Sequence, residues 1–152
     1  MTKKECMILA KEILTTDNIV LGANLSNKEE AIRFTGNILR DNGYVEASYV
    51  DKMLEREELT STYIGNNVAI PHGTEDAKKE VIETGLSVVI APDGVDFDGN
   101  TVNILIGIAG KGDDHLEVLS KIALVCAEEE NIQKLINANT KEDVLELLGG
   151  VN

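Results

Sequence analysis

The sequence predicts a layered α/β domain, because the spacing of its apolar residues changes along the chain. Apolar side chains recur at helical spacing over residues 5–58, whereas residues 62–109 contain apolar runs of strand length. Two of these runs, 85–91 and 101–109, are apolar almost throughout, as in strands that helices cover on both faces. The length of 152 residues fits a single domain, 1–152, with a sizeable core. Helices followed by strands mixed with helices indicate the α/β class.

Three helices are expected before the strands. The first spans residues 5–14. The second begins at a capping box, in which the side chains of Ser26 and Glu29 can each accept the other residue's backbone N–H, and it ends at an Asn-Gly stop at 42–43. The third spans residues 47–58, and its apolar stripe consists of Tyr49, Val50, Met53 and Leu54.

The middle of the chain is expected to supply the sheet. Residues 62–65 and 67–70 are short and β-like, and a brief helical turn is expected at 76–79. The two long apolar strands follow, with turn clusters predicted at 92–94 and 98–100, where Pro, Asp, Gly and Asn gather.

Three further helices are expected after the last strand. The first spans residues 114–127 and the second 128–137, while Thr140 and Asp143 can cap a last helix that ends at 149–150. The residues expected on the inner side of the first of these helices are His115, Leu116, Leu119, Ile122, Ala123 and Cys126.

The net charge of −13 disfavours nucleic acid and anionic membrane surfaces as partners, because both repel surplus acidic groups. It would attract a basic protein partner, although on charge alone plain solubility is the better explanation. No apolar run approaches the ~20 residues that span a bilayer, and the first residues lack the apolar core of a signal peptide. Cys6 and Cys126 each fall in an apolar helical pattern, which indicates free thiols in a reducing compartment. We therefore expect a cytoplasmic protein without direct membrane insertion.

The two histidines of the chain, His72 and His115, each follow an apolar strand. If those strands are parallel neighbours, both imidazoles reach one edge of the sheet, where α/β domains bind ligands. Gly73 lets the backbone approach a ligand closely, and the N–H groups after it and the Thr74 hydroxyl can point at an oxyanion. A neutral imidazole is a nucleophile near neutral pH, so this loop predicts a histidine that can accept a phosphoryl group.

The residues alone leave other interpretations of the histidines open. A histidine after a strand is often a structural residue with satisfied hydrogen bonds. A pair of histidines could hold a metal, but no H-x-x-x-H or C-x-x-C spacing occurs, so none is expected. A general acid–base enzyme would also use two histidines, but no G-x-S-x-G motif accompanies them. Cys126 is interpreted as a core residue, because no basic residue beside it would lower its pKa.

Residues 63–74, Y-I-G-N-N-V-A-I-P-H-G-T, resemble the active-site segment of the enzyme IIA components of the phosphotransferase system, mannitol/fructose class. The L-E-R-E at 54–57, the G-I-A at 107–109 and the H-L-E-V-L at 115–119 resemble the same family, in order along nearly the whole chain. Together with I-E-T-G at 82–85, the I-P-H-G-T core is most similar to the mannitol-specific branch.

This resemblance implies an α/β fold with a mixed, mainly parallel β-sheet that helices flank on both faces. It implies a phosphotransferase in which the phosphocarrier HPr donates a phosphoryl group to His72. His72 then passes the group to a cysteine of enzyme IIB, on a separate polypeptide, during uptake of mannitol or another polyol. His115 would orient the group and Arg56 would offset its charge, without any cofactor.

Three points qualify the resemblance. Without the family, Arg56 is interpreted as a solvated helix residue paired with Glu55 or Glu57. Mannitol-type members can carry a carboxylate where this chain has Asn66, and an amide cannot titrate, so Asn66 is left out of the catalytic residues. The alternative function is a nitrogen-regulatory IIA, which shares the histidine motif and binds other proteins according to its phosphorylation; residues 95–102 argue against it.

Overall fold

The computed structural model describes residues 12–152, beginning with the 3₁₀ helix η1 (Thr16–Asn18). Cys6 and residues 5–11 of the predicted first helix lie outside the described residues, and residues 12–14 are not helical. Among residues 12–152, none of the helices combines the length and the hydrophobicity needed to span a bilayer.

The strands form one mixed sheet in the order β1-β4-β5-β3-β2. The pairs β1–β4 and β3–β5 are parallel, whereas β4–β5 and β2–β3 are antiparallel. The predicted mixed sheet is therefore confirmed, with a long antiparallel hairpin at its centre and parallel pairing on either side of it. The sequence prediction missed the short edge strand β1. The strands are β1 (Ile19–Val20), β2 (Tyr63–Gly65), β3 (Val68–Ala69), β4 (Gly85–Phe97) and β5 (Asn100–Ala109).

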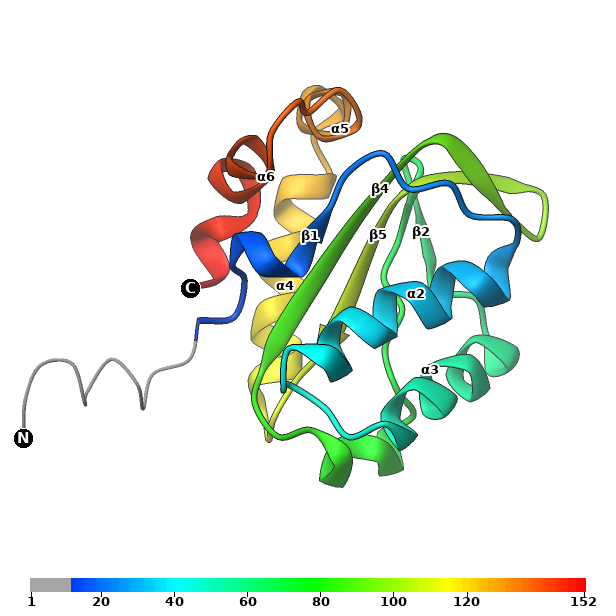
Figure 1. Cartoon of the computed structure of the whole chain (residues 1–152), viewed down its shortest axis with the longest axis vertical. Coiled ribbons are helices and arrows are strands. Elements are labelled where there is room, and N and C mark those ends of the chain that lie inside the picture. The colour runs from blue at the N-terminus through cyan, green and yellow to red at the C-terminus, as the bar shows by residue number, and fades with distance from the viewer. Residues whose placement is uncertain (1–11) are drawn as a thin grey trace, which may run out of the picture.

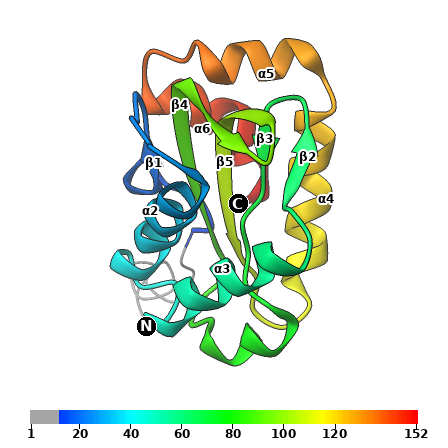
Figure 2. The ribbon, with the colours of Figure 1, turned by 90° about the vertical axis from the view of Figure 1, so that its right-hand side faces the viewer.

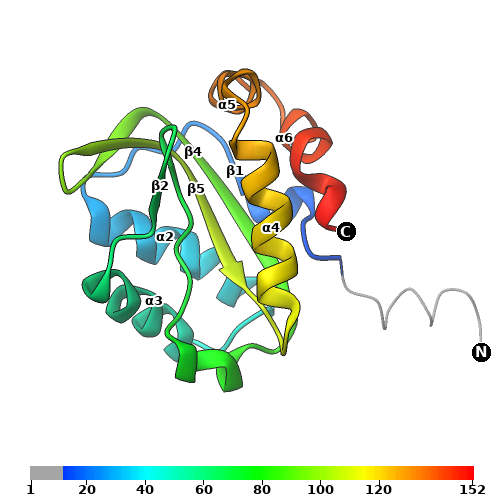
Figure 3. The same cartoon turned by 180° about the vertical axis from the view of Figure 1, so that it is seen from behind.

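Helices cover both faces of this sheet, as predicted (Figure 1). Figure 2 shows α2 to one side of the strands and α4 to the other, and Figure 3 shows α5 and α6 beside α4. The helices of the first face are α2 (Lys28–Asp41) and α3 (Ser48–Leu59). Those of the second are α4 (Asp114–Cys126), α5 (Glu129–Ile136) and α6 (Lys141–Leu148), the last capped by Thr140 as predicted.

Alternate residues of the central hairpin enter two separate cores. Val88 and Ile106 pack with the buried side chains of α4, α5 and α6, whereas Val89 and Leu105 pack with those of α2 and α3. Successive side chains of a strand point to opposite faces, so a strand that is apolar at every position fills both layers. The nearly continuous apolar runs of the sequence are explained by this two-sided burial.

The second helix begins one residue later than predicted. Asn27, not Ser26, is the N-cap of α2: its side chain accepts the N–H of Glu30 at 2.8 Å. The Glu30 carboxylate in turn accepts the N–H of Ser26 at 2.8 Å. The N-cap bond is therefore shifted by one residue along the chain, whereas the return bond from Glu30 goes to Ser26 rather than to the N-cap residue. The predicted stop is confirmed, because α2 ends at Asp41 and Gly43 adopts a φ of 82°.

The prediction of a turn at residues 92–94 was wrong. β4 continues through this segment with an irregularity in its pairing between Ile90 and Val95. The chain reverses instead at the other predicted cluster, where Asp98 and Gly99 have φ values of 56° and 96°. Positive φ at both central residues gives the turn twist that suits a two-residue hairpin.

The inner side of α4 was only partly predicted. Val118, Ile122 and Cys126 are buried, whereas Leu116 and Ala123 are exposed. Leu116 lies two positions, or about 200°, from Val118 around the helix, so it cannot share the buried stripe. Its exposure places an apolar side chain on the surface next to His115.

Candidate functional site

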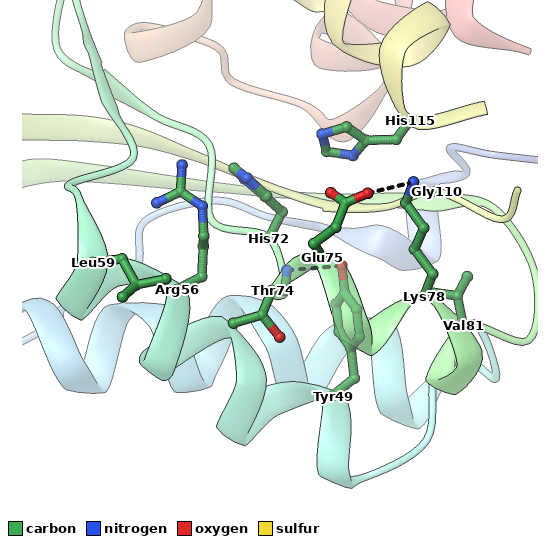
Figure 4. A pocket seen from close by; sticks show the side chains of 11 residues that line it. Tyr49, Arg56, Leu59, His72, Thr74, Glu75, Lys78, Val81, Gly110 and His115 are labelled. Carbon is green, nitrogen blue, oxygen red and sulfur yellow. Dashed lines mark hydrogen bonds and ion pairs between the residues drawn. The ribbon is translucent and has the colours of Figure 1, made fainter. Parts of the chain in front are cut away.

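The two histidines lie at the same edge of the sheet. β3 and β5 are parallel neighbours, and their pairing extends to a bridge between His72 and Ile108. The carbonyl of Pro71 accepts the N–H of Ile108 at 2.9 Å, which fixes the chain just before His72. His115 is the second residue of α4, which follows β5. The centroids of the two imidazole rings are 5.0 Å apart and the rings are tilted by 49° (Figure 4).

The hydrogen bond of His72 determines which of its nitrogens is the nucleophile. Nδ1 lies 2.8 Å from the carbonyl oxygen of Ile70. A carbonyl oxygen only accepts, so the proton of the neutral ring is on Nδ1 and the lone pair is on Nε2. No partner for Nε2 is found among residues 12–152.

His115 is held by the loop before α4. The Thr84 hydroxyl accepts the Lys111 N–H at 3.0 Å and donates to the carboxylate of Asp114 at 2.7 Å. Gly110 is required in this loop, because a Cβ there would lie 2.5 Å from the Cα of His115. These contacts set where α4 begins, and with it the approach of His115 to His72.

Both imidazoles are kept neutral by their surroundings. The pKa of His72 is lowered mainly by burial and also by the positive charge of Arg56. The hydrogen bond to the Ile70 carbonyl and the negative charge of Glu57 act in the opposite direction and raise this pKa. Burial also lowers the pKa of His115, and the positive form of His72 would lower it further. Since the ordinary pKa of histidine is about 6.5, both rings are neutral near pH 7.

The imidazoles line a cavity of about 220 Å³ together with residues of α3 and of the loops around them. Figure 4 shows Arg56 beside His72, and on the other side Lys78, whose ammonium lies 3.0 Å from the Glu75 carboxylate. The lining residues are Tyr49, Arg56, Leu59, His72, Gly73, Thr74, Glu75, Lys78, Val81, Gly110 and His115. The three predicted residues His72, His115 and Arg56 therefore meet at one cavity.

Arg56 is not paired with either neighbouring glutamate. Its Nη1 donates to the carbonyl of Thr60 at 2.7 Å, and no carboxylate of residues 12–152 lies within 4.0 Å of it. The interpretation of Arg56 as a partner of Glu55 or Glu57 was therefore wrong. Its remaining N–H groups can bind an anion, and a guanidinium holds phosphoryl oxygens in a bidentate manner.

The loop after His72 differs from the anion cradle that the sequence predicted. The N–H of Gly73 donates to the hydroxyl of Tyr49 at 2.9 Å, and the Thr74 hydroxyl donates to the carboxylate of Asp76. A Cβ on Gly73 would lie 2.6 Å from the Tyr49 ring, so glycine is needed here for packing against α3. These two donors have protein partners, although both residues line the cavity.

Sequence reasoning missed two residues that hold this site. Tyr49 was expected only as part of an apolar stripe, yet its hydroxyl donates to the Ile108 carbonyl at 2.8 Å and accepts from Gly73. Burial raises the pKa of Tyr49 to about 12, so the hydroxyl stays protonated. Glu57 was considered only as a possible partner of Arg56, and it is buried. The L-E-R-E pattern was the available signal for Glu57, whereas no signal distinguishes a bridging tyrosine from a packed one.

The site offers no metal-binding geometry in the described part of the chain. Residues 12–152 contain no group of three or more His, Cys, Asp or Glu side chains placed to hold an ion. What the cavity presents instead is a neutral nucleophilic imidazole, a second imidazole and a guanidinium, which together suit a tetrahedral anion.

Residues 12–150 match the family model described as "Phosphoenolpyruvate-dependent sugar phosphotransferase system, EIIA 2". The chain belongs to this family. The mannitol-specific phosphotransferase enzyme IIA component of Geobacillus stearothermophilus is 60% identical over 145 residues, which cover 95% of this chain and 100% of the relative. That of Bacillus subtilis strain 168 is 50% identical over 142 residues, 93% and 99% of the two chains. The resemblance inferred from the sequence, and with it the phosphotransferase class, is confirmed.

Solved structures of EIIA proteins share the fold. The crystal structure of IIA mannitol from Escherichia coli has a TM-score of 0.82 and 40% identity, covering 89% of this chain and 98% of that chain. A complex of enzyme IIAMTL with phosphorylated enzyme IIBMTL from the same species gives a TM-score of 0.84 at 40% identity, covering 90% and 97%. The crystal structure of nitrogen regulatory protein IIA-Ntr from Neisseria meningitidis has a TM-score of 0.76 and 27% identity, covering 90% of this chain and 96% of that chain.

Asn66, which is not among the predicted catalytic residues, does not line the cavity. Asn66 has a φ of 51°, and its amide donates to the carbonyl of Cys126 at 3.1 Å, at the end of α4 opposite to His115. Cys126 itself is 3% exposed, and burial raises the pKa of its thiol to about 11, so it is inert near neutral pH. The interpretation of Cys126 as a core residue is confirmed.

Proposed function

We propose that the protein is the phosphoryl carrier of a mannitol uptake system: His72 accepts a phosphoryl group from phosphorylated HPr and passes it to the cysteine of an enzyme IIB. The observation that carries the proposal is the state of His72, whose Nδ1 is bound to the Ile70 carbonyl while Nε2 has no partner among residues 12–152. Relatives named as mannitol-specific IIA components support the choice of sugar.

The transfer needs no proton movement on His72. The Nε2 lone pair attacks phosphorus as the bond from phosphorus to the histidine of HPr breaks. The ring keeps its Nδ1 proton and becomes positively charged, and the carbonyl of Ile70, 2.8 Å away, stabilises that charge. When the thiolate of enzyme IIB attacks the same phosphorus, the bond to Nε2 breaks and His72 returns to its neutral form.

Arg56 and His115 supply the charge stabilisation in this proposal. Phosphoryl transfer spreads negative charge over three equatorial oxygens. Arg56 lines the cavity with N–H groups available for two of them, and the neutral His115 ring can donate one N–H to another. Gly73 and Thr74 form the wall beside the group rather than its main donors.

Two exposed leucines support a protein as the partner at this cavity. Leu59, which lines the cavity, is 72% exposed, and Leu116, next to His115, is 71% exposed. Large apolar side chains beside a reactive group suit a docking protein better than a small polar substrate. We propose that residues 1–152 act as a single cytoplasmic domain in this exchange, without a cofactor and without nucleic acid.

A labelled transfer assay tests the proposal. The protein is incubated with labelled phosphoenolpyruvate, enzyme I and HPr, and then with membranes that contain the mannitol enzyme IIB and IIC parts. We expect label on the wild-type chain and on the control Lys134→Ala, whose side chain lies on α5, and its discharge when mannitol is added. Label on His72→Ala would contradict the proposal.

The second candidate function is nitrogen regulation, supported by the fold shared with IIA-Ntr at 27% identity. In that case the chain would take its phosphoryl group from a dedicated phosphocarrier and act by binding other proteins. The same assay separates the two functions. Failure to take label from HPr, or label that stays on the chain in the presence of enzyme IIB, IIC and mannitol, would favour regulation over transport.

A further inference from the structure

Glu57 is a buried carboxylate in the last turn of α3, next to Arg56. It is 5% exposed, and it accepts the backbone N–H of Thr62 at 3.0 Å and the hydroxyl of the same residue. Its counter-ion is Lys28, whose ammonium lies 3.7 Å away and is also hydrogen-bonded to Asp98 at 2.9 Å. This ion pair contributes little net stability, because Glu57 loses its hydration while the side chain of Lys28, 29% exposed, stays partly in water. The burial of Glu57 therefore calls for a reason other than stability.

A short chain of hydrogen bonds leads from Glu57 to His72. Glu57 holds Thr62 by its N–H and its hydroxyl. The carbonyl of Thr62 accepts the N–H of Ile70 at 3.0 Å. The carbonyl of Ile70 accepts the Nδ1 proton of His72 at 2.8 Å. Both backbone groups of Ile70 are thus engaged, one toward Glu57 and one toward the imidazole.

The same carboxylate also fixes the surroundings of Arg56. The guanidinium of Arg56 donates to the carbonyl of Thr60, which lies between α3 and Thr62. With Glu57 at the end of α3 and Thr62 clamped to it, the segment that carries this carbonyl has fixed ends. One side chain therefore sets the position of both the nucleophile and the cation beside it.

We infer that Glu57 is a positioning residue for phosphoryl transfer, holding His72 with Nδ1 engaged and Nε2 available, and holding Arg56 beside it. The inference rests on the proposed role of His72. The charges agree with it: Arg56 lowers the pKa of His72 and Glu57 raises it, so the two adjacent side chains act on the ring in opposite directions. If Glu57 only stabilised the loop after α3, removing its carboxylate would leave the tautomer of the His72 imidazole unchanged.

The test compares Glu57→Ala with Glu57→Gln in the full-length chain. Ala removes both links to Thr62, whereas Gln keeps an oxygen that can accept the Thr62 N–H. We expect Glu57→Ala to lose the Nδ1–H form of His72 as its main tautomer, seen by ¹⁵N NMR, and to take up phosphoryl groups about 10–100-fold more slowly. We expect Glu57→Gln to keep the tautomer and most of the rate, and to lower the pKa of His72.

Lys28→Met is the matched control, because it removes the charge partner of Glu57 but none of the hydrogen bonds toward His72. It should lose stability, because it leaves the buried Glu57 carboxylate without its counter-ion, while its tautomer and rate stay normal. If Glu57→Ala does not fold, Thr62→Val replaces it, since it removes only the hydroxyl link and should shift tautomer and rate in the same direction.

A folded Glu57→Ala or Thr62→Val variant with the wild-type tautomer and rate would overturn the inference. Failure of the proposed function looks different. In that case the wild-type chain itself takes up no label, and the tautomer measurement still decides whether Glu57 controls the ring.

Discussion

The two ends of the β3–β5 pair both carry clusters of polar side chains, but they use them differently. At the end away from the cavity, Asn66 and Asn67 form a turn with φ values of 51° and 68°. The Asn67 amide donates to the Asn103 side chain at 2.9 Å, and the Asn103 amide donates to the carbonyl of Ala91 at 2.9 Å. Here the amide groups are used to hold the fold.

The histidine end is arranged for a ligand. His72 uses one ring nitrogen for the fold, through Ile70, and the other has no partner among residues 12–152. Arg56 likewise uses one N–H for the Thr60 carbonyl and meets no carboxylate of the described chain within 4.0 Å. Polar clusters look alike in sequence at both ends. The difference lies in how much hydrogen-bonding capacity each cluster leaves unused.

The largest effect is expected from removing the nucleophile. His72→Gln should lower phosphoryl uptake by at least about 10³-fold, because it removes the attacking Nε2, and the neutral ring of His115 is placed to donate an N–H to the group rather than to attack phosphorus. Its free energy of unfolding at pH 7.5 should change little, since only one hydrogen bond to the Ile70 carbonyl is altered. Label transfer from HPr and urea unfolding measure the two quantities. If His72→Gln took up phosphoryl groups at the wild-type rate, the histidine end of the β3–β5 pair would not hold the nucleophile.

A smaller loss is expected at the cation. Arg56→Gln should lower the rate of phosphoryl uptake by about 10²-fold, as when one donor to a developing oxyanion is lost. Arg56→Lys should recover only part of it, because an ammonium cannot bind two oxygens in the same planar arrangement. Single-turnover labelling gives the rates. Equal rates for Gln and wild type would show that the guanidinium is merely solvated.

The opposite end should show the reverse pattern. Asn103→Ala removes the partner of the Asn67 amide and of the Ala91 carbonyl, and we expect it to cost about 1–3 kcal/mol of stability. Phosphoryl uptake by the folded protein should stay normal, because Asn103 does not line the cavity. Urea unfolding and the labelling assay are run on the same sample. Slower phosphoryl uptake would mean that the hydrogen bonds of Asn67 and Asn103 also support the cavity that holds His72.

The smallest effect is on the pH dependence of stability. The pKa values of His72 and His115 are lowered in the folded protein, so below about pH 6.5 the unfolded chain binds protons that the folded one does not. Stability should therefore fall as the pH falls from about 6.5 through the folded pKa values. Unfolding curves of wild type and of His72→Gln with His115→Asn at pH 7.5 and 5.5 should show a weaker dependence in the variant. An unchanged dependence would argue against two half-buried neutral rings.

The sequence predicted the elements better than their edges. Capping residues and periodic apolar spacing identified α2, α3 and the last three helices. Continuous apolar runs identified β4 and β5, because burial on both faces imposes them. The turn at 92–94 was wrong because Pro and Gly also occur at irregularities within a strand. β1 was missed because a two-residue strand has no periodicity to detect.

For the site, the motif identified the residues but not their bonds. His72, His115 and Arg56 follow from the family pattern, and parallel pairing of β3 and β5 brings the rings together. The role of Tyr49 depends on a contact 24 residues away, which no local spacing encodes. For Glu57, the L-E-R-E pattern marked the residue but not its hydrogen bond to Thr62. The loop of Gly73 was expected to bind an anion, whereas its N–H is bound to Tyr49.

The central claim is that Nε2 of His72 carries the phosphoryl group. It is tested most directly by ³¹P and ¹⁵N NMR of the isotope-labelled protein after phosphorylation through enzyme I and HPr. The account predicts one phosphohistidine, with phosphorus coupled to Nε2 of His72 while Nδ1 keeps its proton and its hydrogen bond to Ile70. Phosphorus on Nδ1 of His72, or on His115, would contradict it.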